Sequence, residues 1–214
     1  MAKFSQIEVN EIDLNKIQLT LNPLIDAFNN AQSFAEQDKI FKKVNKEFDE
    51  LQTDISIIYV RYTINTQDEK YAKLQEKIDE VNPYISEIAN KFNKSMVESK
   101  FRSEFENKYG NHLFKMIDNA LKCFSPEIIP ELQEINKLGS EYTSILAGAQ
   151  IKYKGQVYNL TQLSKFAESV DRKVRKEVAK LSAKFFEEHD EKIGEIYDKL
   201  VKLRTAMAHK LGFE

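Results

Sequence analysis

The sequence is poor in the residues that force the backbone to turn. Only six glycines and four prolines occur in 214 residues, so few tight turns are obligatory and long helices are favoured over a β-sandwich or barrel. Tryptophan is absent, but hydrophobic residues make up 42% of the chain and aromatic residues 11%. This supplies enough apolar surface for a packed core in one or two globular domains.

Cysteine and long apolar runs are also scarce. Cys123 is the single cysteine, which excludes an internal disulfide, and its simplest interpretation is a small buried apolar residue. The densest apolar run, at residues 57–60, is far too short to cross a bilayer. Since the N-terminus does not resemble a signal peptide, we expect a soluble, cytoplasmic protein that is not bound to a membrane.

No charge of one sign dominates. Lysine and arginine number 32 against 34 aspartates and glutamates, a net charge of -2, and the two signs alternate along the whole chain. Binding of nucleic acid needs a basic field on one face. The sequence therefore predicts no nucleic-acid partner.

Three long helices are predicted in the first half of the chain. The first begins near Asp13, and Pro23 should bend or restart it. Ser33 and Thr66 each begin a capping-box pattern with a glutamate three residues later. Apolar residues at helical spacing follow both boxes, so two long helices must fold back antiparallel on each other. The second of them should be kinked, not broken, at Pro83.

Shorter elements follow. Helices are predicted at residues 101–109 and 113–123, and a longer one at residues 130–146. The only period-two pattern lies at residues 150–160, where Lys154 and Gly155 can supply a hairpin turn. Thr161 should then cap a short helix. The predicted fold class is mainly all-α: long antiparallel helices with one small β-hairpin near residues 150–160.

The last stretch, residues 171–211, carries the strongest pattern. Its apolar residues keep helical spacing over roughly ten turns, which predicts one continuous helix with a single apolar face. His189 fills the one gap in this apolar stripe. Asp171 is a good N-cap, and Gly212 followed by Phe213 is typical of a left-handed C-terminal cap. Such a stripe needs a partner to cover it.

Catalytic chemistry is not visible in the chain. No two of the histidines His112, His189 and His209 stand four residues apart, so the HExxH zinc motif is missing. His189 is interpreted as a half-buried helix residue, and His209 as a partner of the helix dipole. A glycine-rich phosphate loop is also missing. No catalytic or metal residue is predicted, and residues that bind substrate cannot be assigned. Four acidic residues lie close together in the sequence, and we interpret them as a solvated helix face, not as an acid–base site: Glu187, Glu188, Asp190 and Glu191.

Three arginines could hold elements together. Arg61 lies among apolar residues near a predicted helix end, where it should snorkel or cap the helix. The alternative is a buried ion pair that fixes the hairpin of long helices. For Arg172 and Arg175, we expect one to hold a neighbouring helix or the β-hairpin.

Several stretches, taken together, carry a family resemblance that covers nearly the whole chain. They are RY at residues 61–62, DEKY at 68–71, KF at 91–92, LGSEY at 138–142, the hairpin with Gly155, SVDRKVRKE at 169–177 and LRTAMAHKLGF at 203–213. In order and spacing they resemble the N-terminal part of oligoendopeptidase F and thimet-oligopeptidase zinc metallopeptidases.

The resemblance implies a helical enzyme with its active site in a channel between two halves. Zinc would be bound by HExxH and a further glutamate, all beyond the matching region, so this chain would bind no zinc and be inactive alone. It would form one wall of the channel, restricting substrates to short peptides. Residues 1–148 would be a helical domain, and residues 149–214 a hairpin and helices leading into an absent catalytic domain.

Two questions about partners stay open at this stage. By the resemblance, the apolar stripe of residues 171–211 belongs against the missing C-terminal half, and a fragment that exposes it could self-associate. Read without the resemblance, the chain is a helical protein-interaction or scaffold module without enzymatic activity.

Overall fold

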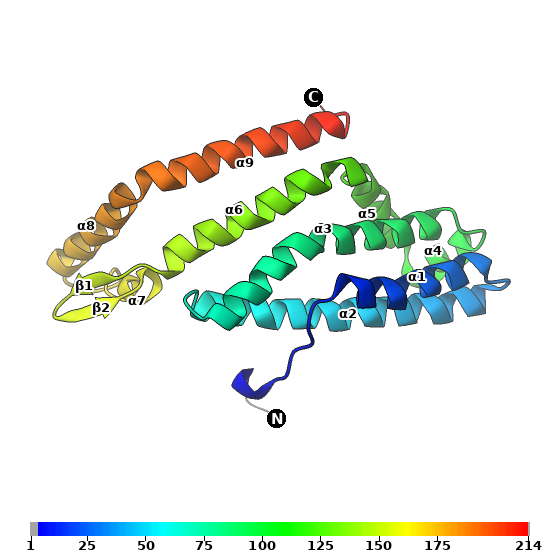
Figure 1. Cartoon of the computed structure of the whole chain (residues 1–214), viewed down its shortest axis with the longest axis horizontal. Helices are drawn as coiled ribbons and strands as arrows, with labels where there is room; N and C mark the ends of the chain where they lie inside the picture. The colour runs from blue at the N-terminus through cyan, green and yellow to red at the C-terminus, as the bar shows by residue number, and fades with distance from the viewer. Residues whose placement is uncertain (1–3, 214) are drawn as a thin grey trace.

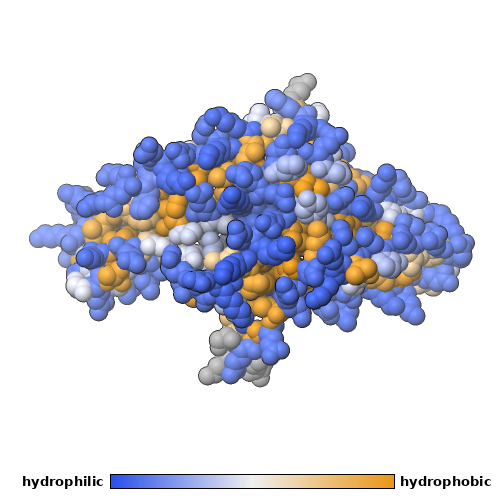
Figure 2. All heavy atoms as spheres, viewed as in Figure 1, coloured by the Kyte–Doolittle hydropathy of each residue, from blue (hydrophilic) through white to orange (hydrophobic). Residues whose placement is uncertain are grey.

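A computed structural model describes residues 4–213 of the chain. Within that range it contains nine α-helices, two short 3-10 turns and one two-stranded antiparallel sheet. Figure 1 shows the long helices lying roughly side by side, with the hairpin at one end of the molecule. Hydrophilic residues cover most of the face in Figure 2, and hydrophobic residues show in the seams between elements. The mainly all-α prediction is confirmed.

The first three helices form the body of the fold. They are α1 (Leu14–Asn30), α2 (Phe34–Ile64) and α3 (Glu69–Val97), and α2 and α3 run antiparallel as predicted (Figure 1). Helix α1 is continuous through Pro23, so the predicted restart is wrong. Helix α3 is likewise unbroken at Pro83, and it bends along its course in Figure 1.

The helix starts depend on caps that the sequence identified only in part. The Ser33 hydroxyl accepts from the Glu36 backbone N–H as expected, but the Glu36 carboxylate accepts from the Gln32 N–H, so the reciprocal half of the box is missing. The capping box at Thr66 is wrong. Asp68 caps α3, because its carboxylate accepts from two first-turn N–H groups.

An aromatic core lies where α4 (Arg102–Tyr109) and α5 (Asn111–Lys122) pack on the body. Phe28, Phe105 and Phe114 are each at most 1% exposed. Gly110, at φ +87°, separates the two short helices, a conformation that residues with a Cβ rarely adopt. Both short helices were predicted to within two residues.

Helix α6 (Ile129–Ala147) follows the 3-10 turn η2 (Pro126–Ile128) and packs on α3. It is also the partner of the last helix, α9 (Asp190–Lys210). The Lys192 ammonium lies 2.7 Å from the Glu141 carboxylate, and that of Lys210 lies 2.5 Å from the carboxylate of Glu131. These two pairs fix α6 and α9 antiparallel.

The predicted hairpin is present as β1 (Ile151–Tyr153) and β2 (Gln156–Tyr158). Its turn residues Lys154 and Gly155 both have positive φ, 49° and 78°, as a two-residue type I′ turn requires. Helix α7 (Leu160–Ser164) follows, but Asn159 caps it through a complete capping box, so the prediction for Thr161 is wrong. The sheet covers a small core with α7 and helix α8 (Arg172–Glu188).

The predicted continuous helix of residues 171–211 is two helices, α8 and α9, which meet at an angle in Figure 1. His189 leaves helical geometry at the junction, with φ −114° and ψ 7°. Its Nδ1 lies 2.8 Å from the Phe185 carbonyl oxygen, and its ring stacks on the Phe185 ring. The predicted caps at the outer ends, Asp171 and Gly212, are confirmed.

The break changes what covers the apolar stripe. Val178 and Phe185 of α8 are buried in the hairpin core, whereas Ile196 is buried where α9 packs on α6. Much of the stripe is therefore covered inside the chain, and the expectation that it awaits an absent half is wrong for these residues. The large apolar side chains that remain exposed on α8 and α9 are Phe186, Tyr197 and Val201.

Candidate functional site

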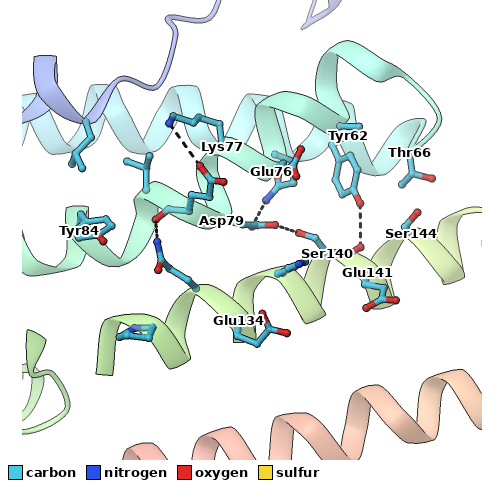
Figure 3. A pocket seen from close by; sticks show the side chains of 18 residues that line it. Tyr62, Thr66, Glu76, Lys77, Asp79, Tyr84, Glu134, Ser140, Glu141 and Ser144 are labelled. Atoms are coloured by element: carbon cyan, nitrogen blue, oxygen red, sulfur yellow. Dashed lines mark hydrogen bonds and ion pairs between the residues drawn. The ribbon is translucent and has the colours of Figure 1, made fainter. Parts of the chain in front are cut away.

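An open groove of about 820 Å³ lies between α3 and α6. Figure 3 shows side chains from α2, α3 and α6 around it. Its polar lining residues are Tyr62, Thr66, Gln75, Glu76, Lys77, Asp79, Glu80, Tyr84, Gln133, Glu134, Lys137, Ser140, Glu141 and Ser144.

A hydrogen-bonded carboxyl lies at the centre of the groove. The Ser140 hydroxyl donates to Asp79 Oδ2 at 2.5 Å, and the Gln75 amide donates to Asp79 Oδ1 at 2.9 Å. Burial raises the pKa of the Asp79 carboxyl, and the charge of Glu76 acts in the same direction, although both hydrogen bonds oppose the rise. In Figure 3 the Asp79 and Ser140 side chains point toward each other across the two helices.

Further hydrogen bonds lock the two helices together. The Tyr62 hydroxyl donates to the Ser140 carbonyl at 3.1 Å, and burial raises the pKa of this phenol. The Asn136 and Gln133 side-chain amides donate to carbonyl oxygens of Asp79 and Glu80. The groove floor is therefore a fixed polar surface made by side chains of α6 on the backbone of α3.

The groove has the makings of a binding surface and lacks a catalytic constellation. Ser140 donates its hydroxyl hydrogen to a carboxyl, and no histidine lines the groove to form a serine–histidine pair with it. Among residues 4–213, no group of three or more histidine, cysteine, aspartate or glutamate side chains is placed to hold a metal ion. Zinc does not fit the residues described.

Asp79 offers a test of this description. Replacing Asp79 by asparagine should keep the hydrogen bond from Ser140, and the Gln75 carboxamide can turn so that its oxygen accepts from the asparagine N–H. The cost of burying a charge is removed, so at pH 7 the free energy of unfolding should rise by about 1 kcal/mol. A raised pKa in the folded state favours folding at low pH, and this advantage is lost as pH rises through the folded pKa. Urea unfolding at pH 7 and pH 3.5 should show the gain only at pH 7. A variant less stable at pH 7 would mean that the carboxylate's hydrogen bonds outweigh the cost of its burial.

The histidines and the cysteine lie apart from this groove. His189 is half-buried as predicted, but it lies at the α8–α9 junction and not within a helix. His209 is exposed and lies in the last turn of α9, the position in which an interaction with the helix dipole was predicted. His112, in the first turn of α5, is exposed too. Cys123 is exposed, not buried. The prediction failed because Cys123 is the C-cap of α5, beyond the last residue that the helix packs on the core.

Arg61 joins separate elements of the fold, and its hydrogen-bond partners are neither the carbonyls at the end of its own helix nor the carboxylate of the alternative ion pair. Its guanidinium donates to the Tyr71 hydroxyl on α3 at 2.9 Å and to the carbonyls of Phe4 and Ile7 at 2.8 and 2.6 Å. It also lies over the rings of Phe4 and Tyr71. Arg61 thus joins α2, α3 and the N-terminal segment through carbonyls and aromatic rings.

The other charged candidates act locally. Arg175 donates to the carbonyls of Ser169 and Val170, just ahead of its own helix, so the expected bridge to a neighbouring helix or the hairpin is wrong for this residue. Arg172 is exposed. The four acidic side chains predicted to form a solvated face are exposed as well, namely Glu187, Glu188, Asp190 and Glu191.

The sequence did not predict that several polar side chains are buried, two of which are Asp38 and Gln75. Asp38, 7% exposed, accepts from Lys42, Lys108 and Tyr109. Gln75, 6% exposed, lies three residues before the buried Ile78 and on the same face of α3. The available signal was position, because Gln75 falls on the apolar stripe of α3, where a polar residue has to be buried.

The helical fold that carries the groove between α3 and α6 is that of a known class of peptidase domain. A family model described as the peptidase M3 N-terminal domain matches residues 4–124, and the chain therefore belongs to the peptidase M3 family. No curated protein matches the chain.

Solved structures agree over nearly the full length. The chain is 40% identical to PZ peptidase A, solved with an inhibitor, over 99% of its own length and with a TM-score of 0.93. It is 36% identical, over its whole length and with a TM-score of 0.94, to a protein described as an oligoendopeptidase F. A protein so described from Bacillus anthracis str. Ames is 31% identical over 98% of the chain, with a TM-score of 0.93.

The chain spans only 38% of the length of PZ peptidase A and of the first oligoendopeptidase F, and 39% of the third structure. It is thus similar to the non-catalytic N-terminal domain of these peptidases. Within the described residues, no helix is both long enough and apolar enough to span a membrane.

Proposed function

We propose that this chain is the N-terminal, non-catalytic portion of a zinc-dependent metallo-oligopeptidase that hydrolyses short peptides. The supporting observation is the structural match over 98% to 100% of the chain to peptidases of which it makes up well under half. Zinc and the residues that activate water would come from the remaining part of such an enzyme.

In this proposal the chain forms one wall of a substrate channel. The groove between α3 and α6 is open and partly apolar, and hydrogen bonds between the helices hold its shape. A fixed wall excludes folded proteins by size and admits extended peptides. The proposed division places the helical domain at residues 1–148 and the segment that leads into the catalytic part at residues 149–214. The cytoplasm, where an exposed thiol such as Cys123 stays reduced, is the proposed location.

The test is peptidase activity with a short quenched fluorescent peptide and zinc. Two proteins are compared: the 214-residue chain, and a chimera in which it replaces the matching part of PZ peptidase A. We expect the chain alone to be inactive and the chimera to cut, and a chelator should abolish that activity. Cleavage by the chain alone would contradict the non-catalytic assignment, whereas an inactive but folded chimera would favour the alternative of a scaffold module.

Two controls separate the parts of the proposal. A chimera that cuts a folded protein as readily as the peptide would contradict the channel-wall role. Size-exclusion chromatography of the chain over a range of concentrations tests self-association through exposed residues such as Tyr197 and Val201. A concentration-independent monomer would remove self-association from the account.

A further inference from the structure

A second, smaller groove of about 290 Å³ lies at the open end of the β-hairpin. No charged residue lines it, although charged residues make up 31% of the chain. Its lining comes from the α2–α3 turn, the segment before β1, the strand β2 and the start of α7. The lining residues are Ile64, Asn65, Thr66, Gln67, Ala147, Gly148, Ala149, Gln150, Val157, Tyr158, Asn159 and Gln162.

The groove lies beside a strand edge with free backbone groups. In the hairpin, Tyr153 pairs with Gln156 next to the two-residue turn, and Lys152 pairs with Val157. Residue pairs of an antiparallel ladder alternate between exchanging hydrogen bonds and not doing so, starting from the bonded pair at such a turn. The N–H and C=O of Val157 therefore point away from β1, as do those of Lys152 on the opposite edge.

Only one of these two edges borders the groove. Val157 and Tyr158 of β2 line it, whereas none of the β1 residues Ile151–Tyr153 does. The groove also has two exposed apolar side chains on its walls, Ile64 at 74% and Val157 at 55% exposed. Free backbone groups and apolar contact surface thus occur together on the β2 side.

The polar lining suits a peptide backbone. Gln67 and Gln150 present exposed carboxamides, and a carboxamide can both donate to a carbonyl and accept from an N–H group. A two-stranded sheet is marginal in isolation and gains stability from a third strand. A neutral groove with such groups favours an uncharged, extended segment, because a charged side chain would lose hydration there without gaining a partner.

We propose that the outer edge of β2 binds an extended peptide as a third strand, with uncharged side chains seated between Ile64 and Val157. This is strand addition, in which backbone hydrogen bonds supply affinity and the neighbouring groove selects side chains. The inference rests on the proposed function in one respect, namely that the extended segment belongs to a peptide substrate. It names the class of that substrate stretch: apolar or small, without charge.

The experiment is a titration of the ¹⁵N-labelled 214-residue chain, followed by amide NMR shifts and hydrogen exchange. The probe is the peptide acetyl-Gly-Val-Ala-Val-Gly-amide. We expect the Val157 amide to shift and to exchange more slowly with peptide bound, while the outward amide of Lys152 on the other edge stays unchanged. Equal changes at both amides, or none at Val157, would overturn the proposal.

Two matched comparisons test the contacts. The same peptide, N-methylated at its three central residues, keeps the side chains but loses the N–H donors, and it should not perturb Val157. Ile64→Ala should weaken binding about threefold through lost apolar contact, whereas Leu19→Ala, which removes a side chain 77% exposed on α1, should leave it unchanged. Equal binding of the methylated peptide, or equal effects of both variants, would exclude strand addition at this edge.

The chimera with PZ peptidase A separates this inference from the proposed function. If the Val157 amide is already protected in the chimera without peptide, the third strand comes from the enzyme's own chain and the peptide assignment is wrong. Peptide cleavage by the chimera with no effect on Val157 would overturn strand addition and leave the peptidase assignment standing. Binding at Val157 with no cleavage by the chimera would do the reverse.

Discussion

Replacing Phe105 by alanine is expected to lower the free energy of unfolding by about 4 kcal/mol, the usual cost of emptying a large aromatic site in a core. Phe105 is fully buried, and its ring lies 5.0 Å from that of Phe34 and 5.5 Å from that of Phe41 in edge-to-face contacts. Since α4 has only eight residues and Phe105 is its single buried side chain, Phe105 supplies the main apolar contact of this helix with the body. Urea unfolding followed by far-ultraviolet circular dichroism measures the loss.

Phe186 provides the matched control for this substitution. It has the same side chain and lies in a helix, but it is 43% exposed, so Phe186→Ala should cost less than about 1 kcal/mol. If the two variants lost equal stability, the aromatic core around α4 would not be a major stabilising element.

Replacing Asp38 by asparagine is the second large effect, with an expected loss of about 2 kcal/mol at pH 7. The carboxylate lies 2.8 Å from the ammonium groups of Lys42 and Lys108 and accepts from the Tyr109 hydroxyl at 2.5 Å. Asparagine has no charge to offer the two lysines, so both ion pairs are lost. The measurement is urea unfolding of the wild-type chain and of Asp38→Asn at several pH values between 7 and 3.

The stabilisation that the Asp38 carboxylate provides should decrease as the pH falls. Burial would raise the pKa of Asp38, but hydrogen bonds from Lys108, Lys42 and Tyr109 outweigh burial and hold it well below its usual range. The stabilisation is therefore present above the unfolded pKa, about 4, and is lost as pH falls from there toward the folded pKa. The gap between wild type and Asp38→Asn should narrow below pH 4. Asp49→Asn, exposed on the same helix, should show no gap, and a gap that stays constant with pH would refute the ion-pair account.

The spacing of apolar residues predicted the helices because it shows which side chains must be buried on one helix face. The stripes of α2 and α3, the type I′ turn at Gly155 and the caps at Ser33 and Asp171 follow from local chemistry, and all are present. Proline was over-weighted at position 23, where no restart occurs, whereas Pro83 lies inside an unbroken helix as predicted. Packing of the flanking turns offsets the hydrogen bond that each proline removes.

The candidate sites could not be predicted from sequence patterns within single helices or strands, because each site joins residues far apart in the chain. Asp79 meets Ser140 across 61 residues of sequence, and Val157 and Ile64 line the same groove only because the hairpin folds back beside the α2–α3 turn. A pattern on one helix shows that a polar residue is buried but does not name its partner. The break at His189 was missed for a related reason, since the apolar spacing continues across it while the two helices pack on different elements.

Because the helix is broken at His189, the rotation of α9 about its own axis is not a direct continuation of the rotation of α8. Inserting one residue into an uninterrupted helix turns everything beyond it by about 100°, which would swing Ile196 away from α6. Because α9 begins anew after His189, its rotation about its own axis is set by α6 and is not inherited from α8. We therefore expect a change of length on the hairpin side to disturb the contacts of α9 less than it would in one continuous helix.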